Sequence, residues 1–210
     1  MRVRPVTPEG LAEELTELIA AAAPADGWFR VAVDGPPVAE PDRLAEALVG
    51  PLRARGHATL HVRTADFLRP ASVRLEFGRT NPDAYYEGWV DEAGLRREVL
   101  DPAGPGGTGR VLPSLWDARR DRATRAAYLN LPPGGVVLVS GDLLLGSGLP
   151  FELAVHLVLS PAALARRTPP DLAWTLPVYE RYAAEVAPET FADLVVTVND
   201  PRHPAIMSVD

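Results

Sequence analysis

The chain has 210 residues, 47% of them hydrophobic, which is enough for one domain, residues 1–210, with a substantial core. The formal net charge of −7 argues against a nucleic acid or an anionic membrane as partner. Cysteine is absent, which excludes disulfides, thiolate zinc sites and cysteine nucleophiles.

The first predicted element is an alanine-rich helix over residues 11–22. Glu13, Glu14 and Glu17 interrupt its apolar residues, so the segment is predicted to be an amphipathic helix and neither a signal peptide nor a membrane span. A cytoplasmic location follows as the expectation. The four histidines lack metal-ligand spacing, and no metal site is expected.

Helices and short apolar strands then alternate along the chain. Strands are predicted at residues 29–34, 58–63, 136–139, 155–159 and 194–198, and helices at residues 42–55, 161–167 and 178–186. Valine- and leucine-rich strands of this length are typical of a parallel sheet that is buried on both faces. The sequence therefore predicts an α/β fold with three layers and five parallel strands, with helices on both faces. The core would comprise residues 28–64 and 134–206, with an insertion at about 65–130 in which Asp91 caps a helix through Leu100.

Residues 35–42 (GPPVAEPD) lie between the first strand and the next helix, where a phosphate-binding loop of the pattern G-x-x-x-x-G-K-[ST] would lie. Only Gly35 fits the pattern. Three prolines lack the backbone N–H groups that cradle phosphate. Glu40, Pro41 and Asp42 replace the second glycine, the lysine and the hydroxyl residue, which places two negative charges beside the site. Ordinary ATP binding is therefore not expected, and the segment also fits a plain strand-to-helix turn.

A family resemblance rests on an ordered set of segments. These are residues 65–70 (ADFLRP), 78–86 (GRTNPDAYY), 100–107 (LDPAGPGG), 116–119 (WDAR) and 194–201 (LVVTVNDP). Together with residues 176–188 they resemble the bacterial uridine kinase-like branch of the P-loop nucleoside kinases, from about residue 28 to 206. The resemblance implies a P-loop-kinase-like fold, in which the insertion forms the side that holds the phosphoryl acceptor.

On that acceptor side, Asp66 matches the family's catalytic acidic residue, which would take the proton from a ribose hydroxyl. Further positions of the family's nucleoside pocket are matched by Arg69, Tyr85, Tyr86, Asp91 and Arg119. Leu68 departs from the family, which usually carries a polar histidine there. Without the resemblance, Asp66 would fit a turn cap and the tyrosines would fit packing roles.

On the side of the phosphate donor, the family's features are missing. Ser140 stands where the family has a strand-end carboxylate near Mg²⁺, and Asp142 could substitute only if the turn is remodelled. The lid keeps Arg166 and Arg167, which also fit a solvated helix end, but Trp174 stands where the family tends to have arginine. At least two parts of the phosphoryl-transfer machinery are therefore absent.

Three functions remain open from the sequence. The first is a pseudokinase that binds a small, nucleoside-like ligand without ATP. The second is an active phosphotransferase, which would need ATP and Mg²⁺, with Arg43, Arg166 or Arg167 supplying the missing charge. The third is an ATP-independent enzyme that uses Asp66 as general base. No cofactor is expected under the first, and a homodimer through a helix face is compatible with all three.

Overall fold

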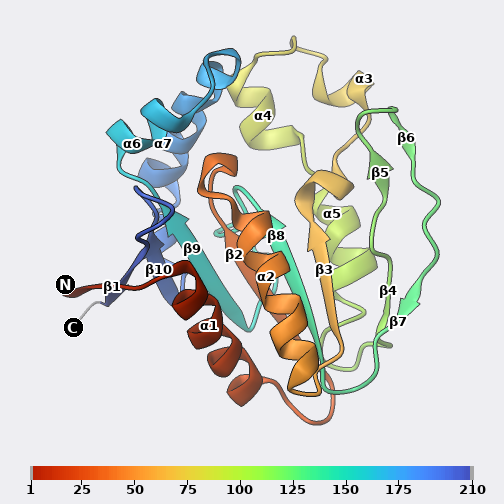
Figure 1. The fold of residues 1–210 in the computed structure, drawn as a ribbon. Coiled ribbons are helices and arrows are strands. Elements are labelled where there is room, and N and C mark those ends of the chain that lie inside the picture. Colours follow the sequence, from red (N-terminus) through yellow and green to blue (C-terminus); the bar gives the residue numbers. More distant parts are fainter. Residues whose placement is uncertain (1, 209–210) are drawn as a thin grey trace.

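A central β-sheet organises the molecule (Figure 1). The structure is a computed structural model that describes residues 2–208. The sheet has seven strands in the order β1-β11-β10-β9-β2-β8-β3. Its strands are β1 (Arg2–Pro5), β2 (Trp28–Asp34), β3 (Thr59–Arg63), β8 (Gly135–Gly141), β9 (Leu153–Val158), β10 (Leu194–Thr197) and β11 (Ala205–Ser208).

The five predicted strands are confirmed as the parallel part of the sheet, from β10 through β9, β2 and β8 to β3. The expected number of five is corrected to seven, because β11 and β1 extend the sheet with antiparallel pairing. Each added strand has only 4 residues. So short a segment carries no clear alternation of apolar and polar residues, which is why the sequence pattern does not reveal it.

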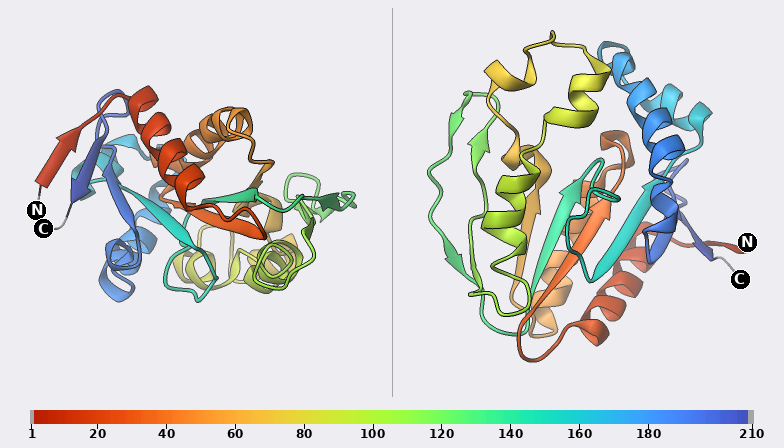
Figure 2. Two further views of the ribbon diagram at one scale, coloured as in Figure 1. Left: turned by 90° about the horizontal axis from the view of Figure 1, so that it is seen from below. Right: turned by 180° about the vertical axis from the view of Figure 1, so that it is seen from behind.

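Helices cover both faces of the sheet (Figure 2). The helices α1 (Pro8–Ala22) and α2 (Pro41–Ala54) pack on one face. The other face is covered by α5 (Glu92–Leu95), the π-turn Arg96–Leu100 and α7 (Leu176–Glu185). Along β2, Val31 and Val33 join the first core while Ala32 joins the second, as the alternation of a strand requires. This is the predicted three-layer α/β fold.

Residues 64–134 connect β3 to β8 and lie beside β3 (Figure 1). They form the short helices η2 (Thr64–Phe67), α3 (Ala71–Arg74) and α4 (Pro82–Gly88) and two small antiparallel pairs, β4 (Arg110–Val111) with β7 (Leu129–Asn130) and β5 (Trp116–Asp117) with β6 (Arg122–Ala123). Asp91 caps α5 through a hydrogen bond from the Gly94 N–H, and the π-turn extends that helix to Leu100, as predicted. No helix among the described residues is long and apolar enough to cross a membrane.

The strand register brings the carboxyl ends of the parallel strands together. Asp34 at the end of β2 lies opposite Gly141 of β8 and His156 of β9. Arg63 at the end of β3 lies opposite Ser140. Helix α6 (Pro161–Arg167) and the 3-10 segment Pro170–Thr175 follow β9 and lead into α7. In open α/β sheets this edge is where ligands bind.

Candidate functional site

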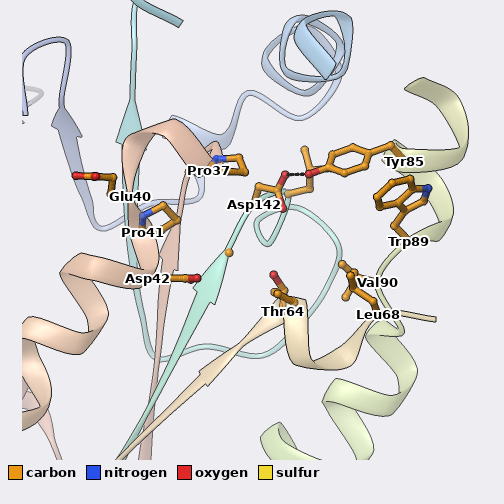
Figure 3. A pocket seen from close by; sticks show the side chains of 14 residues that line it. Pro37, Glu40, Pro41, Asp42, Thr64, Leu68, Tyr85, Trp89, Val90 and Asp142 are labelled. Carbon is orange, nitrogen blue, oxygen red and sulfur yellow. Dashed lines mark hydrogen bonds between the residues drawn. The ribbon is translucent and has the colours of Figure 1, made fainter. Parts of the chain in front are cut away.

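A cavity of about 280 Å³ opens at the carboxyl ends of β2, β3 and β8 (Figure 3). We call it the edge cavity. One side is formed by the segment between β2 and α2, and the other by residues of η2 and α4. Its lining residues are Gly35, Pro37, Glu40, Pro41, Asp42, Thr64, Ala65, Leu68, Tyr85, Trp89, Val90, Gly141, Asp142 and Leu143. Most of the walls are therefore apolar, and the charged side chains among them are all carboxylates.

Loop 35–42 folds into a tight turn whose backbone N–H groups are largely used by the protein itself. A 3-10 turn, η1 (Pro37–Ala39), occupies the centre of the loop. The N–H of Gly35 donates to Gly141 O, that of Ala39 to Pro36 O, and that of Glu40 to Pro37 O. The three prolines have no N–H to offer. Six of the eight residues of the loop therefore present no free donor to an anion.

Glu40 takes a left-handed backbone conformation, with φ of 61°. Glycine adopts this conformation without a steric penalty, whereas a side chain makes it unfavourable by about 1 kcal/mol. Glu40 occupies the place of the second glycine in the phosphate-loop pattern. The backbone at this one position therefore still has a geometry suited to glycine, although a carboxylate now stands there.

Asp42 begins a chain of four polar side chains behind the loop. The Ser140 hydroxyl donates to Asp42 Oδ1 at 2.5 Å, and His61 Nε2 lies 2.8 Å from Ser140 Oγ. The other ring nitrogen of His61 lies 3.0 Å from Glu46 Oε2 on α2. In P-loop enzymes the loop supplies a hydroxyl and the neighbouring strand a carboxylate, and both serve Mg²⁺. Here the hydroxyl and the carboxylate have exchanged places and bond to each other.

The Asp142 carboxylate lies at the centre of the edge cavity. Oδ2 accepts hydrogen bonds from Tyr85 at 2.6 Å and from Tyr179 on α7 at 2.8 Å. The Tyr85 ring contacts Trp89 and Trp174 edge-on, with centroid distances of 4.8 and 5.5 Å. Burial raises the pKa of Asp142 above its ordinary value, while the two tyrosine hydroxyls oppose that shift. The cavity thus joins an aromatic wall to one strongly desolvated acid.

We expect Asp142→Asn to stabilise the protein at neutral pH, because asparagine avoids the cost of burying an ionised carboxylate. The folded-state pKa of Asp142 is raised. Its contribution to the free energy of unfolding is therefore fully present below the ordinary pKa and is lost as the pH rises through the raised pKa. An asparagine Oδ1 still accepts hydrogen bonds from both tyrosines and carries no charge. Urea unfolding at about pH 5 and about pH 8 measures the difference, which should be larger at the higher pH. A variant less stable than the wild type at both pH values would contradict this account.

The structure places Tyr85 and loop 35–42 at the edge cavity, but Asp66 is not among its lining residues. Arg63 holds the Asp66 carboxylate with two hydrogen bonds of 2.9 and 3.0 Å. The Arg69 carbonyl accepts from Arg74, and its side chain lies outside the lining. The remaining acceptor-side residues are also elsewhere: Tyr86 stacks under Arg181, Asp91 caps α5, and Arg119 is exposed in the β5–β6 turn.

The arginines near the loop do not line the edge cavity either. Arg43 pairs with Glu40 at 3.2 Å on the exposed surface. Arg167 donates to the Val198 carbonyl at 2.6 Å, and Arg166 is exposed on α6. The sequence contains no lysine at any position, so no residue of the chain replaces the missing loop lysine in kind. The edge cavity therefore combines carboxylates with apolar walls and has no cationic side chain.

Sequence reasoning did not anticipate the parts that Trp89 and Tyr179 play in this cavity. It considered Asp142 only as a substitute for a strand-end carboxylate. Asp142 becomes central because Gly141 ends β8 and lets the chain turn back toward the loop. A Cβ atom at Gly141 would come within 2.0 Å of Thr64 Oγ1, so this turn requires glycine. In the sequence, the signal for this turn is the tripeptide Ser-Gly-Asp at the end of an apolar strand.

Comparison with known proteins identifies the fold. No protein-family model and no curated protein matches the sequence. Among solved structures, a possible uridine kinase from Bacillus stearothermophilus superposes with a TM-score of 0.70 at 16% identity, covering 88% of this chain and 96% of that one. A "putative fructose transport system kinase" from Silicibacter sp. TM1040 gives 0.59 at 20% identity, covering 90% and 98%. The chain thus has the fold of the uridine kinase-like P-loop kinases.

Proposed function

We propose that this chain is a kinase-like binding protein that does not use ATP and that holds a small, unphosphorylated ligand in the edge cavity. The observation that carries the proposal is the lining of this cavity, which contains three carboxylates, Glu40, Asp42 and Asp142, and no cation. A triphosphate placed there would face like charges, each costing on the order of 1 kcal/mol or more. Phosphoryl transfer depends on positive groups and N–H donors aimed at the phosphates, and the loop offers few of either.

Two observations argue against the other functions. An active phosphotransferase needs compensating cations, yet Arg43 and Arg167 are engaged by Glu40 and by the Val198 carbonyl. Arg166 is exposed on α6 and lies outside the lining of the edge cavity. An enzyme with Asp66 as general base needs that carboxylate within reach of a bound ligand. Asp66 is instead paired with Arg63 and lies outside the lining of the cavity.

The walls also indicate which ligand fits. The aromatic group of Tyr85 and Trp89 offers a face for a planar ring, and the Asp142 carboxylate offers an acceptor for its N–H or O–H groups. A nucleoside-like molecule without phosphate has both features. The same proposal includes a cytoplasmic location and no nucleic-acid or membrane partner, in keeping with the net charge of −7.

Calorimetric titration tests the proposal with two probes, Mg·ATP and uridine. We expect no saturable heat with Mg·ATP and saturable binding of uridine that Ala65→Trp abolishes. Ala65 is exposed and lines the edge cavity, so a tryptophan there would block the cavity without disturbing the core. Micromolar binding of Mg·ATP would refute the proposal and favour an active phosphotransferase.

A further inference from the structure

A second and larger cavity, of about 440 Å³, lies between the end of β9 and helices α6 and α7. We call it the β9 cavity. It shares no lining residue with the edge cavity. Its volume falls in the range of about 300–1,000 Å³ that is typical of small-molecule sites. Nothing in the proposed function uses it.

His156 supplies a polar atom inside this cavity. The residue lines the cavity although it is 4% exposed. Its Nδ1 atom lies 2.7 Å from Oδ2 of Asp34, a fully buried carboxylate that also accepts from the Leu144 N–H. The other ring nitrogen, Nε2, has no hydrogen-bond partner within residues 2–208. Trp89 Nε1 is the one buried side-chain polar atom without a partner in the described part of the chain, so His156 Nε2 is not sealed in the core but can be reached from the cavity.

Asp34 fixes which nitrogen of the ring carries the proton. A carboxylate beside Nδ1 selects the tautomer with the proton on that atom, so Nε2 of the neutral ring presents a lone pair. A turn of the ring would remove the hydrogen bond between His156 Nδ1 and Asp34 Oδ2, which is the shortest that Asp34 makes. The β9 cavity therefore contains a fixed hydrogen-bond acceptor held by a buried carboxylate.

The walls restrict what can bind opposite this acceptor. They are largely apolar, with Leu157, Leu164 and Leu176 among them, and no arginine lines the cavity. The charged side chains of the lining are Glu180 and Glu189, both exposed. An anionic ligand would meet only negative charge here, whereas a neutral ring can bury its faces against the leucines.

We propose that the β9 cavity is a second ligand site, which binds a neutral planar heterocycle through an N–H donated to His156 Nε2. The ligand places its ring between the sheet and helices α6 and α7 and leaves no charge in the cavity. The two cavities meet at Tyr179, which lines the β9 cavity and donates to Asp142 of the edge cavity.

The test uses benzimidazole as probe, 1-methylbenzimidazole as the matched compound without the N–H, and ¹⁵N NMR of the histidine rings. The His156 Nε2 signal of the free protein is the reference. Benzimidazole should shift this signal in a saturable manner, and the methylated compound should bind about threefold to tenfold more weakly, as the loss of one hydrogen bond implies.

Two exposed alanines give matched variants. Ala183→Trp should block the β9 cavity and abolish the shift, whereas Ala65→Trp blocks the edge cavity and should leave it unchanged. Both positions are exposed and neither alanine belongs to the Asp34–His156 pair, so we expect both variants to fold. The proposal is overturned by a protonated Nε2 in the free protein at neutral pH, by the absence of a saturable shift up to the solubility limit of the probe, or by a shift that only Ala65→Trp removes.

Discussion

Asp34→Ala should destabilise the protein by about 3–5 kcal/mol, because each buried donor left without an acceptor costs about 1–3 kcal/mol. Three donors meet at this carboxylate: His156 Nδ1 at 2.7 Å, the Leu144 N–H at 2.9 Å and the Tyr182 hydroxyl at 3.3 Å. Alanine leaves His156 Nδ1 and the Leu144 N–H buried without an acceptor, whereas the Tyr182 hydroxyl can still donate to the Leu145 carbonyl at 3.1 Å. Urea unfolding followed by circular dichroism measures the loss as a lower midpoint with an unchanged slope.

The matched control is Asp83→Ala. Asp83 also accepts from a basic residue, Arg181 at 3.2 Å, but its side chain is 81% exposed. Removing an exposed ion pair should change the free energy of unfolding by less than about 1 kcal/mol. If the two variants lost similar stability, the buried network around Asp34 would not be the feature that holds the carboxyl ends of β2 and β9 together.

The contrast between the parallel strands and the edge cavity shows what a sequence can reveal. The parallel strands were predictable because Val31, Val33 and their neighbours form long apolar runs, and a pattern of this kind depends only on local residue order. The shortage of N–H donors in loop 35–42 was also predictable from the sequence, because proline lacks an N–H in any structure. Both predictions needed no knowledge of distant contacts.

The cavities depend on contacts between distant parts of the chain. Asp142 and Tyr85 are 57 residues apart in sequence, and Asp34 and His156 are 122 apart. Neither pair forms a motif with fixed spacing, so no local pattern indicates them. Asp66 illustrates the opposite case. The resemblance implies a catalytic role for it, whereas the conformation of η2 directs its carboxylate to Arg63 and away from the edge cavity.

Restoring the loop pattern should create affinity for Mg·ATP. The variant combines Glu40→Gly, Pro41→Lys, Asp42→Ser and Ser140→Asp. Glycine suits the φ of 61° at position 40, lysine adds both an N–H and a cation, and the last two changes return the hydroxyl and the carboxylate to the places they have in P-loop enzymes. The site gains about two units of positive charge. At roughly 1 kcal/mol per charge this amounts to about 10- to 100-fold tighter binding, measured by calorimetry.

The double variant Asp42→Ser with Ser140→Asp is the matched control. It reverses the hydrogen-bonded pair but leaves the net charge and Pro41 unchanged, so it should gain no affinity for Mg·ATP. The variant with four substitutions could fold and still bind Mg·ATP no better than this control. That result would show that Pro36 and Pro37 alone exclude the phosphates. If the wild-type protein already binds Mg·ATP as tightly as the variant with four substitutions, loop 35–42 accepts a triphosphate despite its carboxylates.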